Sequence, residues 1–281
     1  VLLNDGDEVI IPSPYWLSYP AIVKLAGGNP VILKTTAENG FRIKKQSLIS
    51  KITEKTKFII INSPNNPTGK VLNEEELHIL AEVLRENQNI NLISDEIYEL
   101  ILKKDLHHIS FAAFAKDLKD RIYTVNGFAK GWAMTGWRLG YLVGKKEVIK
   151  ASSTLQSQST SNVCSFVQRG GLAALKINKE FFDEINSKFD ERRDILCKGL
   201  IKIKGIYIEP PNGAFYAFPK LPNQKISSVE FCKNVLEDYG LVVVPGKAFG
   251  DDQCIRISCA SSKKKILDGL SRLEKAVKSY Y

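Results

Sequence analysis

The chain has 281 residues, of which 44% are hydrophobic and 25% are charged, and it carries a formal net charge of +9. These proportions are ordinary for a globular protein and exclude a low-complexity or fibrous chain. The lysines are spread along the expected helices and are not interleaved with aromatic residues, so no nucleic-acid partner is expected. No apolar run reaches the roughly 18 residues of a membrane-spanning helix, so no membrane partner is expected either.

The cysteines and the single methionine bear on location and completeness. The five cysteines are scattered and form no C-x-x-C pair, which is typical of reduced thiols in a cytoplasmic protein, and no metal site is expected from them. The only methionine is Met134, and Val1-Leu2-Leu3 is typical of the end of an element already under way. We therefore expect an N-terminal portion of the protein to be missing from this chain.

The first half of the chain alternates short apolar strands with helical segments. A helix is predicted after Asn73, since Glu76 three residues later completes a partial capping box and Leu77, Leu80 and Leu84 share one face. The alternation predicts an α/β fold with a large, doubly wound, mostly parallel sheet covered on both faces. The candidate strands are Glu8–Ile11, Phe58–Ile61, Ile90–Ser94, Ile122–Val125 and Leu139–Val143.

After about Ala173 the pattern changes to a long charged helix followed by short strands and two further helices. This order predicts a smaller C-terminal α/β layer domain. We expect residues 1–173 to form the large domain and residues 174–281 the small one, with the boundary inside a connecting helix. The expected helices are Glu180–Lys204, Val229–Tyr239 and Lys265–Ser279, and the expected strands are Ile206–Glu209, Ala214–Phe218, Leu241–Val244 and Cys254–Ser258.

Two polar side chains follow predicted strands of the large sheet directly. Lys130 lies just after Ile122–Val125, and Asp95 follows Ile90–Ser94. Ligands of open α/β sheets bind at the carboxyl ends of the strands, so both residues are candidates for a site. A carboxylate in that place is not expected in a core, although Asp95 could also serve as a helix N-cap.

Two further candidates are a tyrosine and an asparagine. Tyr98 lies on the same face as Asp95 if a helix begins there, and the alternative is a half-buried tyrosine with its hydroxyl in water. Asn66 belongs to a stretch rich in proline and asparagine, residues 61–69, that leaves a buried strand. Such a composition requires a fixed, non-helical backbone.

Two arginines and a tryptophan complete the candidates. Arg138 offers a planar fork suited to phosphate, and its charge would lower the pKa of Lys130; an ordinary surface arginine is the alternative. Arg256 shares a strand face with Cys254, and such a charge needs a partner, either a substrate carboxylate or a local acidic side chain. Trp16 follows the first strand and suits stacking on a ring, with Tyr15 or a core position as the competing interpretation.

These segments together resemble the class I and II aminotransferases, fold-type I enzymes that use pyridoxal 5′-phosphate. The resemblance is carried by Asn65-Asn66-Pro67-Thr68-Gly69, Ser94-Asp95-Glu96-Ile97-Tyr98, the segment from Arg121 to Arg138, and Cys254–Ser258. It implies that Lys130 is the catalytic lysine and holds the cofactor as an internal aldimine. It also implies that Asp95 pairs with the pyridine nitrogen of the cofactor.

The resemblance assigns roles to the remaining candidates as well. Tyr98 is expected to donate a hydrogen bond to the phenolic oxygen of the cofactor, and Asn66 to touch that oxygen and the substrate carboxylate. Arg138 is expected to bind the phosphate, and Arg256 to clamp the substrate α-carboxylate. Trp16 is expected to stack on the cofactor ring and to contact the substrate. Many relatives carry serines at the positions of Gly127 and Ala129, and their absence leaves the phosphate to Arg138 and to backbone amides.

The expected reaction is transfer of the amino group of L-aspartate to a 2-oxo acid, 2-oxoglutarate, by a cytoplasmic homodimer. Aspartate follows from resemblance to the bacterial-type branch, since residues 156–160 contain no arginine for a distal carboxylate. Aromatic amino acids, alanine and prephenate also remain open as substrates. A carbon–sulfur β-lyase would use the same cofactor and fold, and a non-catalytic relative would keep the fold without the activity.

Overall fold

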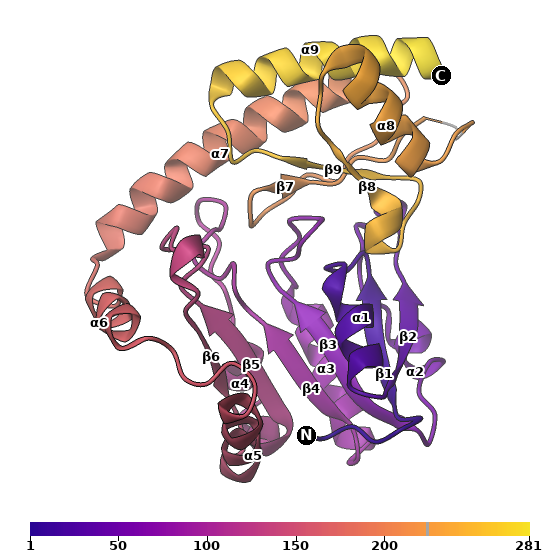
Figure 1. Cartoon of the computed structure of the whole chain (residues 1–281). Helices are drawn as coiled ribbons and strands as arrows, with labels where there is room; N and C mark the ends of the chain where they lie inside the picture. The colour runs from indigo at the N-terminus through magenta and orange to yellow at the C-terminus, as the bar shows by residue number, and fades with distance from the viewer. Residues whose placement is uncertain (223–224) are drawn as a thin grey trace.

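The computed structural model describes residues 1–222 and 225–281, and their strands form two sheets (Figure 1). The larger sheet has the order β2-β1-β3-β4-β5-β6, in which all pairs are parallel except the antiparallel β5–β6 pair. The expected α/β class with a mostly parallel sheet is confirmed. The strands are β1 (Glu8–Ser13), β2 (Asn29–Lys34), β3 (Thr56–Asn62), β4 (Asn91–Asp95), β5 (Ile122–Gly127) and β6 (Gly140–Val143).

Helices cover both faces of this sheet. The longest helix, α7 (Lys179–Lys202), leads from this layer to the second sheet. That second sheet has the order β7-β9-β8, with strands β7 (Tyr216–Ala217), β8 (Val244–Pro245) and β9 (Ile255–Ser258). The α-helices are α1 (Ser18–Leu25), α2 (Lys45–Ile49), α3 (Glu74–Glu86), α4 (Phe111–Phe114), α5 (Lys146–Ser157), α6 (Ser165–Ala174), α7 (Lys179–Lys202), α8 (Ser228–Tyr239) and α9 (Lys263–Tyr280). Short 3₁₀ segments are η1 (Ala37–Asn39), η2 (Lys116–Arg121), η3 (Thr135–Trp137) and η4 (Gly246–Phe249).

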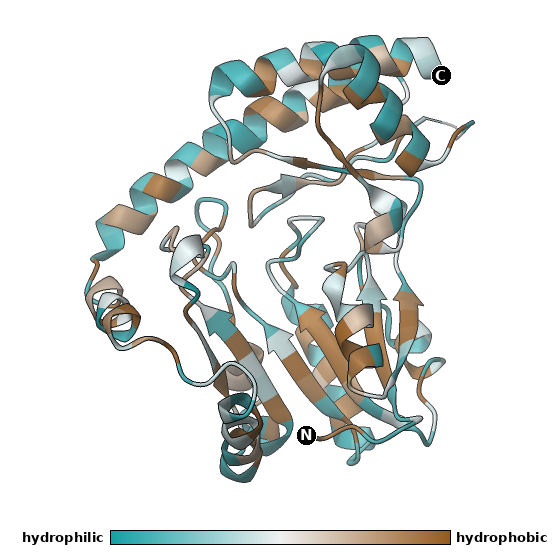
Figure 2. Ribbon diagram, viewed as in Figure 1, coloured by the Kyte–Doolittle hydropathy of each residue, from teal (hydrophilic) through white to brown (hydrophobic). Residues whose placement is uncertain are grey.

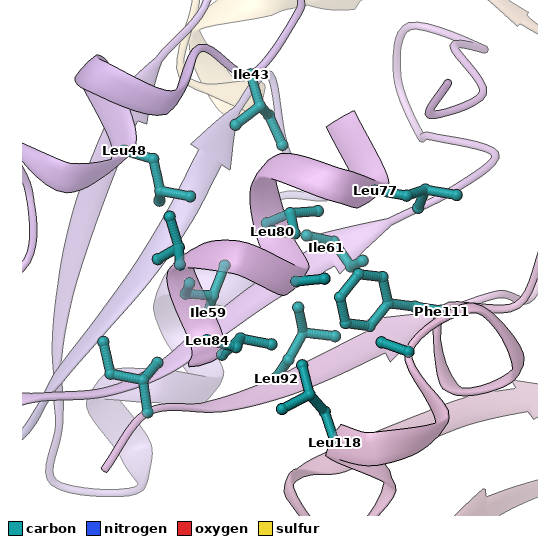
Figure 3. Close-up of a cluster of buried hydrophobic side chains, with 14 of the residues drawn as sticks. Ile43, Leu48, Ile59, Ile61, Leu77, Leu80, Leu84, Leu92, Phe111 and Leu118 are labelled. Carbon is teal, nitrogen blue, oxygen red and sulfur yellow. The ribbon is translucent and has the colours of Figure 1, made fainter. Parts of the chain in front are cut away.

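Successive residues of the central strands alternate between two apolar cores because side chains in a strand point to opposite faces. Figure 2 shows hydrophobic residues along much of β3, in the middle of the sheet. One core lies against α3, whose Leu77, Leu80 and Leu84 face the sheet, and Figure 3 shows their packing. The second core lies against α1 and α5. The strand residues of the first core include Ile10, Ile59, Ile61, Leu92 and Ile122, and those of the second include Val9, Ile11, Phe58, Ile60 and Tyr123.

The helix expected after Asn73 is confirmed as α3, with its full capping box. The Asn73 side chain accepts a hydrogen bond from the Glu76 amide at 2.9 Å, and Glu76 Oε2 accepts one from the Asn73 amide at 3.3 Å. Two of the amide donors at the helix N-terminus are satisfied in this way.

The strands of the C-terminal part are shorter than expected, and one expectation is wrong. Residues Ile206–Glu209 form no strand; only an isolated bridge joins Tyr207 to Lys220. Prolines at 210, 211, 219 and 222 flank these two segments. Since proline has no amide hydrogen to donate, a longer ladder cannot form here.

The three-stranded sheet lies above the carboxyl ends of the parallel strands, with α7 running beside both layers (Figure 1). The expected division after residue 173 falls in the last turn of α6, and it stays a prediction. Neither α1 nor β2 was expected from the sequence. None of the helices in the described part of the chain has the length and apolar content that crossing a lipid bilayer requires.

Candidate active site

Asp95 ends β4 and lies on the α1 side of the sheet, because it alternates with Ser94. Tyr19 of α1 donates a hydrogen bond to Asp95 Oδ2 at 2.5 Å, and the Ile97 amide donates one to Oδ1 at 3.2 Å. Burial raises the pKa of Asp95, although the bond from Tyr19 acts in the opposite direction. No ion pair joins Asp95 to a cationic side chain within residues 1–222 and 225–281. The site therefore contains a partly exposed carboxylate, largely withdrawn from water, that is held by a neutral phenol.

Tyr19 is a site residue that the sequence interpretation missed. Its ring is 8% exposed and its hydroxyl reaches Asp95 because α1 begins at Ser18, directly after the loop that follows β1. Pro20 lies in the first turn of α1, where proline is tolerated because the amides there have no partner inside the helix. That proline was the available signal for a helix starting near Ser18.

Glu96 points to the opposite face of the sheet and fixes the turn that follows β4. Its Oε1 accepts hydrogen bonds from Ser94 Oγ at 2.8 Å, Ser110 Oγ at 3.1 Å and the Phe111 amide at 3.2 Å. Its Oε2 lies 3.1 Å from Nε2 of His108. These contacts tie the residues around 95–100 to α4, so the polypeptide after Asp95 is anchored from the back of the sheet.

Tyr98 is placed by a turn, and the helix considered at Asp95 does not form. Residues 97–100 are a turn in which the Glu99 amide donates to the Glu96 carbonyl at 2.8 Å. The Tyr98 side chain is 3% exposed, so its hydroxyl is not in water. That hydroxyl lies 3.1 Å from the hydroxyl of Tyr216, and burial raises the pKa of Tyr98 strongly.

Lys130 lies in the loop after β5, at the carboxyl edge of the sheet. Its Nζ is 5.8 Å from the ring centre of Tyr98 and 5.9 Å from that of Phe215. Burial lowers the pKa of Lys130, and the positive charges of Arg256 and Arg138 lower it further. A larger fraction of this amine is therefore neutral at a given pH than in a free lysine, which suits a nucleophile or a base.

Arg256 of β9 reaches the loop that follows β3. Its Nη1 donates to Oδ1 of Asn66 at 2.9 Å, and the Asn66 amide donates to Oδ1 of Asn62 at 2.8 Å. The guanidinium carbon lies 4.5 Å from the ring centre of Tyr216 and 4.9 Å from that of Phe249. Within the described residues Arg256 Nε is buried and has no hydrogen-bond partner. A buried, unsatisfied guanidinium donor is suited to an anionic ligand.

Trp16 and Arg138 are more exposed than the rest of the candidates. Trp16 is 37% exposed, and its ring meets that of Tyr19 edge-on at a centroid distance of 5.4 Å. Arg138 is exposed, with a φ of 54°, and its Nη1 donates to the Thr135 carbonyl at 3.0 Å. Arg138 thus lies at the surface, and its positive charge still lowers the pKa of Lys130.

The structure leaves no space for a side chain at position 127. Gly127 pairs with Gly140 across the antiparallel β5–β6 pair, and a Cβ at Gly127 would meet the Gly140 Cα and the Leu139 carbonyl at 2.8 Å. A serine cannot be accommodated there without moving β6.

The donor set around Lys130 fits pyridoxal 5′-phosphate. An amine with a lowered pKa suits the aldehyde, and a carboxylate largely withdrawn from water and without an ion-pair partner suits a protonated ring nitrogen. A buried phenol and an amide suit the phenolic oxygen, and a guanidinium with an unpartnered Nε suits a carboxylate. Asp95, Tyr98, Lys130, Asn66 and Arg256 thus meet at one edge, whereas Trp16 and Arg138 lie at its exposed margin.

The comparison with protein families gives one match over nearly the whole chain. The model of aminotransferase class I and II matches residues 1–273. A probable aspartate/prephenate aminotransferase of Aquifex aeolicus is 42% identical over 281 residues, covering 98% of this chain and 71% of the relative. The aspartate aminotransferase of Bacillus subtilis is 42% identical over 285 residues, covering 100% of this chain and 72% of the relative.

Solved structures give the same result. An aspartate aminotransferase of Rhizobium meliloti superposes with a TM-score of 0.93 at 38% identity, covering 98% of this chain and 72% of that one. An aromatic aminotransferase of Pyrococcus horikoshii superposes with a TM-score of 0.94 at 37% identity, covering 99% and 74%. The likeness in sequence and in fold therefore extends over the segment from Trp16 to Arg256.

Proposed function

Because the chain belongs to the class I and II aminotransferases, which use pyridoxal 5′-phosphate, we propose that it transfers the amino group of L-aspartate to 2-oxoglutarate. The single observation that carries the proposal is the contact between Arg256 and Asn66 at 2.9 Å. It joins a carboxylate-binding side chain of the three-stranded sheet to a cofactor-side loop of the six-stranded sheet. Aspartate as the donor is supported by relatives named aspartate aminotransferase.

The roles of the cofactor-binding residues form part of the proposal. Lys130 binds the aldehyde carbon, Asp95 the ring nitrogen, Tyr98 and Asn66 the phenolic oxygen, and Arg138 the phosphate, while Trp16 stacks on the ring. Pyridoxal phosphate, when bound, supplies a sink for the electron pair left at the substrate α-carbon. Asp95 keeps the ring nitrogen protonated, and Tyr19 keeps Asp95 oriented through the hydrogen bond to Oδ2.

Four side chains bind the substrate or move its proton. Arg256 binds the α-carboxylate through a planar fork, which fixes the orientation of the amino acid, and Asn66 and Trp16 contact the substrate beside it. Once the amino acid has displaced it from the aldehyde carbon, Lys130 Nζ, with its lowered pKa, would take the proton from the α-carbon and deliver it to the C4′ carbon of the cofactor.

The test is an absorbance scan of the purified protein with pyridoxal phosphate, before and after addition of aspartate. We expect the spectrum of the bound cofactor to change with aspartate and to return with 2-oxoglutarate, and we expect Lys130→Ala to show neither change. A response to aromatic amino acids or alanine but not to aspartate would contradict the donor, and a return of the spectrum with prephenate but not with 2-oxoglutarate would contradict the acceptor. Release of ammonia and pyruvate from a cysteine conjugate without a 2-oxo acid would identify a β-lyase.

A homodimer in the cytoplasm also belongs to the proposal. Exposed apolar side chains of β6 and α6, among them Val143, Phe166 and Leu172, support a second copy of the chain as partner. The five free cysteines support a reducing compartment. Sedimentation of the purified protein tests the dimer, and a monomer at micromolar concentration would contradict it.

A further inference from the structure

Tyr216 lies between two side chains that serve different parts of the reaction. Its hydroxyl is 3.1 Å from the hydroxyl of Tyr98, which lies on the cofactor side, and the two rings meet edge-on at 5.8 Å. Its ring face lies 4.5 Å from the guanidinium carbon of Arg256, which lies on the substrate side. The sequence interpretation did not single out this residue.

The fold leaves Tyr216 little freedom to move. Its side chain is 7% exposed, and its strand β7 pairs with β9, where Tyr216 is opposite Ser258. The preceding residues are tied to the larger sheet, because the Gly213 amide donates to the Gly69 carbonyl at 2.7 Å and the Ala214 amide to the Ile101 carbonyl at 2.8 Å. At Gly69, with a φ of 69°, a Cβ would lie 2.8 Å from the Tyr216 carbonyl. The turn that carries Tyr216 is therefore fixed from both layers.

We propose that Tyr216 is a positioning residue that holds Tyr98 with its hydroxyl and Arg256 with its ring, so that one side chain aligns the cofactor-binding tyrosine with the substrate-binding arginine. This inference rests on the proposed function, since it requires Tyr98 to contact the cofactor and Arg256 to contact the substrate. Tyr216 itself touches neither reacting group in this assignment.

The direction of the hydrogen bond follows from counting protons. A tyrosine hydroxyl carries one proton, so Tyr98 cannot donate to the phenolic oxygen of the cofactor and to Tyr216 together. With the cofactor bound, Tyr216 must donate to the oxygen of Tyr98. Such a chain of two hydroxyls polarises the second O–H bond and makes Tyr98 a stronger donor. The Tyr216 hydroxyl thus helps to stabilise the anionic form of the phenolic oxygen.

The ring of Tyr216 acts on Arg256 by a separate interaction. A guanidinium over an aromatic face is attracted by the electron density of the ring, and this close contact restricts how the arginine can turn. Phe249 lies on the same guanidinium at 4.9 Å, so the fork of Arg256 is held against two rings. Loss of the Tyr216 ring would loosen the fork, whereas loss of the hydroxyl alone would not.

The first experiment separates the hydroxyl from the ring with Tyr216→Phe in the cofactor-loaded protein. We expect the pKa read from the absorbance of the bound cofactor to rise by about 0.3 to 1, as expected for one weakened hydrogen bond. The KM for aspartate should stay within about twofold of wild type, because the ring remains. In a Tyr98→Phe background the same substitution should leave that pKa unchanged, since the effect passes through Tyr98. An unchanged pKa in Tyr216→Phe, or an equal rise in the Tyr98→Phe background, would overturn the hydroxyl part of the proposal.

The second experiment removes the ring with Tyr216→Leu. We expect the KM for aspartate and the Kd of a non-reactive dicarboxylate to rise by about 3- to 30-fold, as expected for a lost cation–π contact at a largely desolvated site. The exposed Tyr207, replaced likewise by Leu, is the matched control and should change neither constant. Thermal melting of every variant shows whether it folds. If Tyr216→Leu melts near wild type and binds the dicarboxylate equally well, the ring part is wrong.

The wild-type spectrum distinguishes the two levels of inference. If wild type shows no bound-cofactor absorbance or no response to any amino acid, the proposed function fails and the role of Tyr216 fails with it. If wild type behaves as a transaminase while both Tyr216 variants match it, only the role of Tyr216 is overturned.

Discussion

The environment of Lys130 favours its function but lowers the stability of the folded protein. Its amine is partly buried, and burial and the positive charges of Arg256 and Arg138 all oppose its own positive charge. A protein selected only for stability would place an apolar side chain there, whereas a nucleophilic amine requires this environment. Stability is therefore expected to depend on pH through this one residue.

Replacement of Lys130 by Met should stabilise the cofactor-free protein at neutral pH. The pKa of Lys130 is lowered on folding from the ordinary value of 10.5, so the unfolded chain binds more protons between the two pKa values and wild-type stability rises with pH across that window. We expect the melting temperature of Lys130→Met to exceed that of wild type by on the order of 1–3 °C at pH 7, with a gap that narrows toward pH 10.

The exposed Lys150 on α5 offers the control, because Lys150→Met should leave the melting temperature nearly constant at both pH values. A gap for Lys130→Met that widens with pH would show that charge repulsion in the folded state is not the cause.

Tyr19 gives a second prediction at the scale of one hydroxyl. Tyr19→Phe removes the donor to Asp95 Oδ2, and without it burial raises the pKa of Asp95 further. The carboxylate then holds the ring nitrogen less firmly, and kcat/KM should fall by about 5- to 50-fold, as for a hydrogen bond to a charged group. Tyr239→Phe removes an equivalent hydroxyl, bonded to Ser279 at 2.6 Å far from the site, and should keep wild-type kinetics. Equal kinetics for both variants would count against a role for Tyr19.

The site could be predicted only in part from the sequence. Lys130 and Asp95 were found because each lies at or soon after the end of a recognisable apolar strand, and their position at one sheet edge follows from the topology. Asn66 and Arg256 are 190 positions apart in the sequence, and a local sequence pattern cannot predict that two such distant residues are in contact. Tyr19 and Tyr216 were missed for the same reason, since each acquires its role only when another element is packed beside it.

At the scale of elements, strands were predicted correctly where hydrophobic burial alone determines the structure. Strands β1 and β3 contain apolar runs that are buried on both faces, so hydrophobicity alone reveals them. Strands β4 and β5 have shorter apolar stretches that alternate with partly exposed residues, and they were recognised beside the neighbouring turn residues. Strand β2 was missed because it is an edge strand with Pro30 and little burial, which the sheet tolerates only at its edge. The strands of the three-stranded sheet were predicted to be longer than they are. Prolines limit the hydrogen-bonded ladder, whereas the apolar sequence pattern continues past the ends of the strands.

The cap of α3 is testable apart from the active site. Asn73→Ala removes the acceptor for the Glu76 amide, and we expect the free energy of unfolding to fall by about 0.5–2 kcal/mol. The kcat/KM should stay within twofold of wild type, because α3 covers the face of the sheet opposite Tyr19 and Asp95. Glu75→Ala, in the same turn but exposed, should cost less. Chemical denaturation measures the difference, and a larger loss for Glu75→Ala would refute the capping account.

At the scale of the whole molecule, the site exists only where the two sheets meet. The six-stranded sheet supplies Lys130, Asp95 and the Asn66 loop, and the three-stranded sheet supplies Arg256 and Tyr216. Helix α7 secures this arrangement through Arg193, which is 2% exposed. Its guanidinium donates to the Ala214 carbonyl at 2.5 Å and to the Leu102 carbonyl at 3.0 Å, and it pairs with Asp190 at 2.5 Å.

Arg193→Met should therefore weaken stability and substrate binding together. The substitution leaves two carbonyl groups without the guanidinium donor and Asp190 without its ion-pair partner, although the Lys104 amide still donates to Asp190, so we expect the free energy of unfolding to fall by about 2–4 kcal/mol. Because Ala214 lies two residues before Tyr216, release of its carbonyl should also loosen Arg256 and raise the KM for aspartate. Lys198→Met, on the exposed face of α7, should change neither quantity. If unfolding becomes easier while the KM stays constant, the turn that carries Tyr216 is held by Gly69 and Ile101 alone, and α7 contributes to stability without contributing to the site.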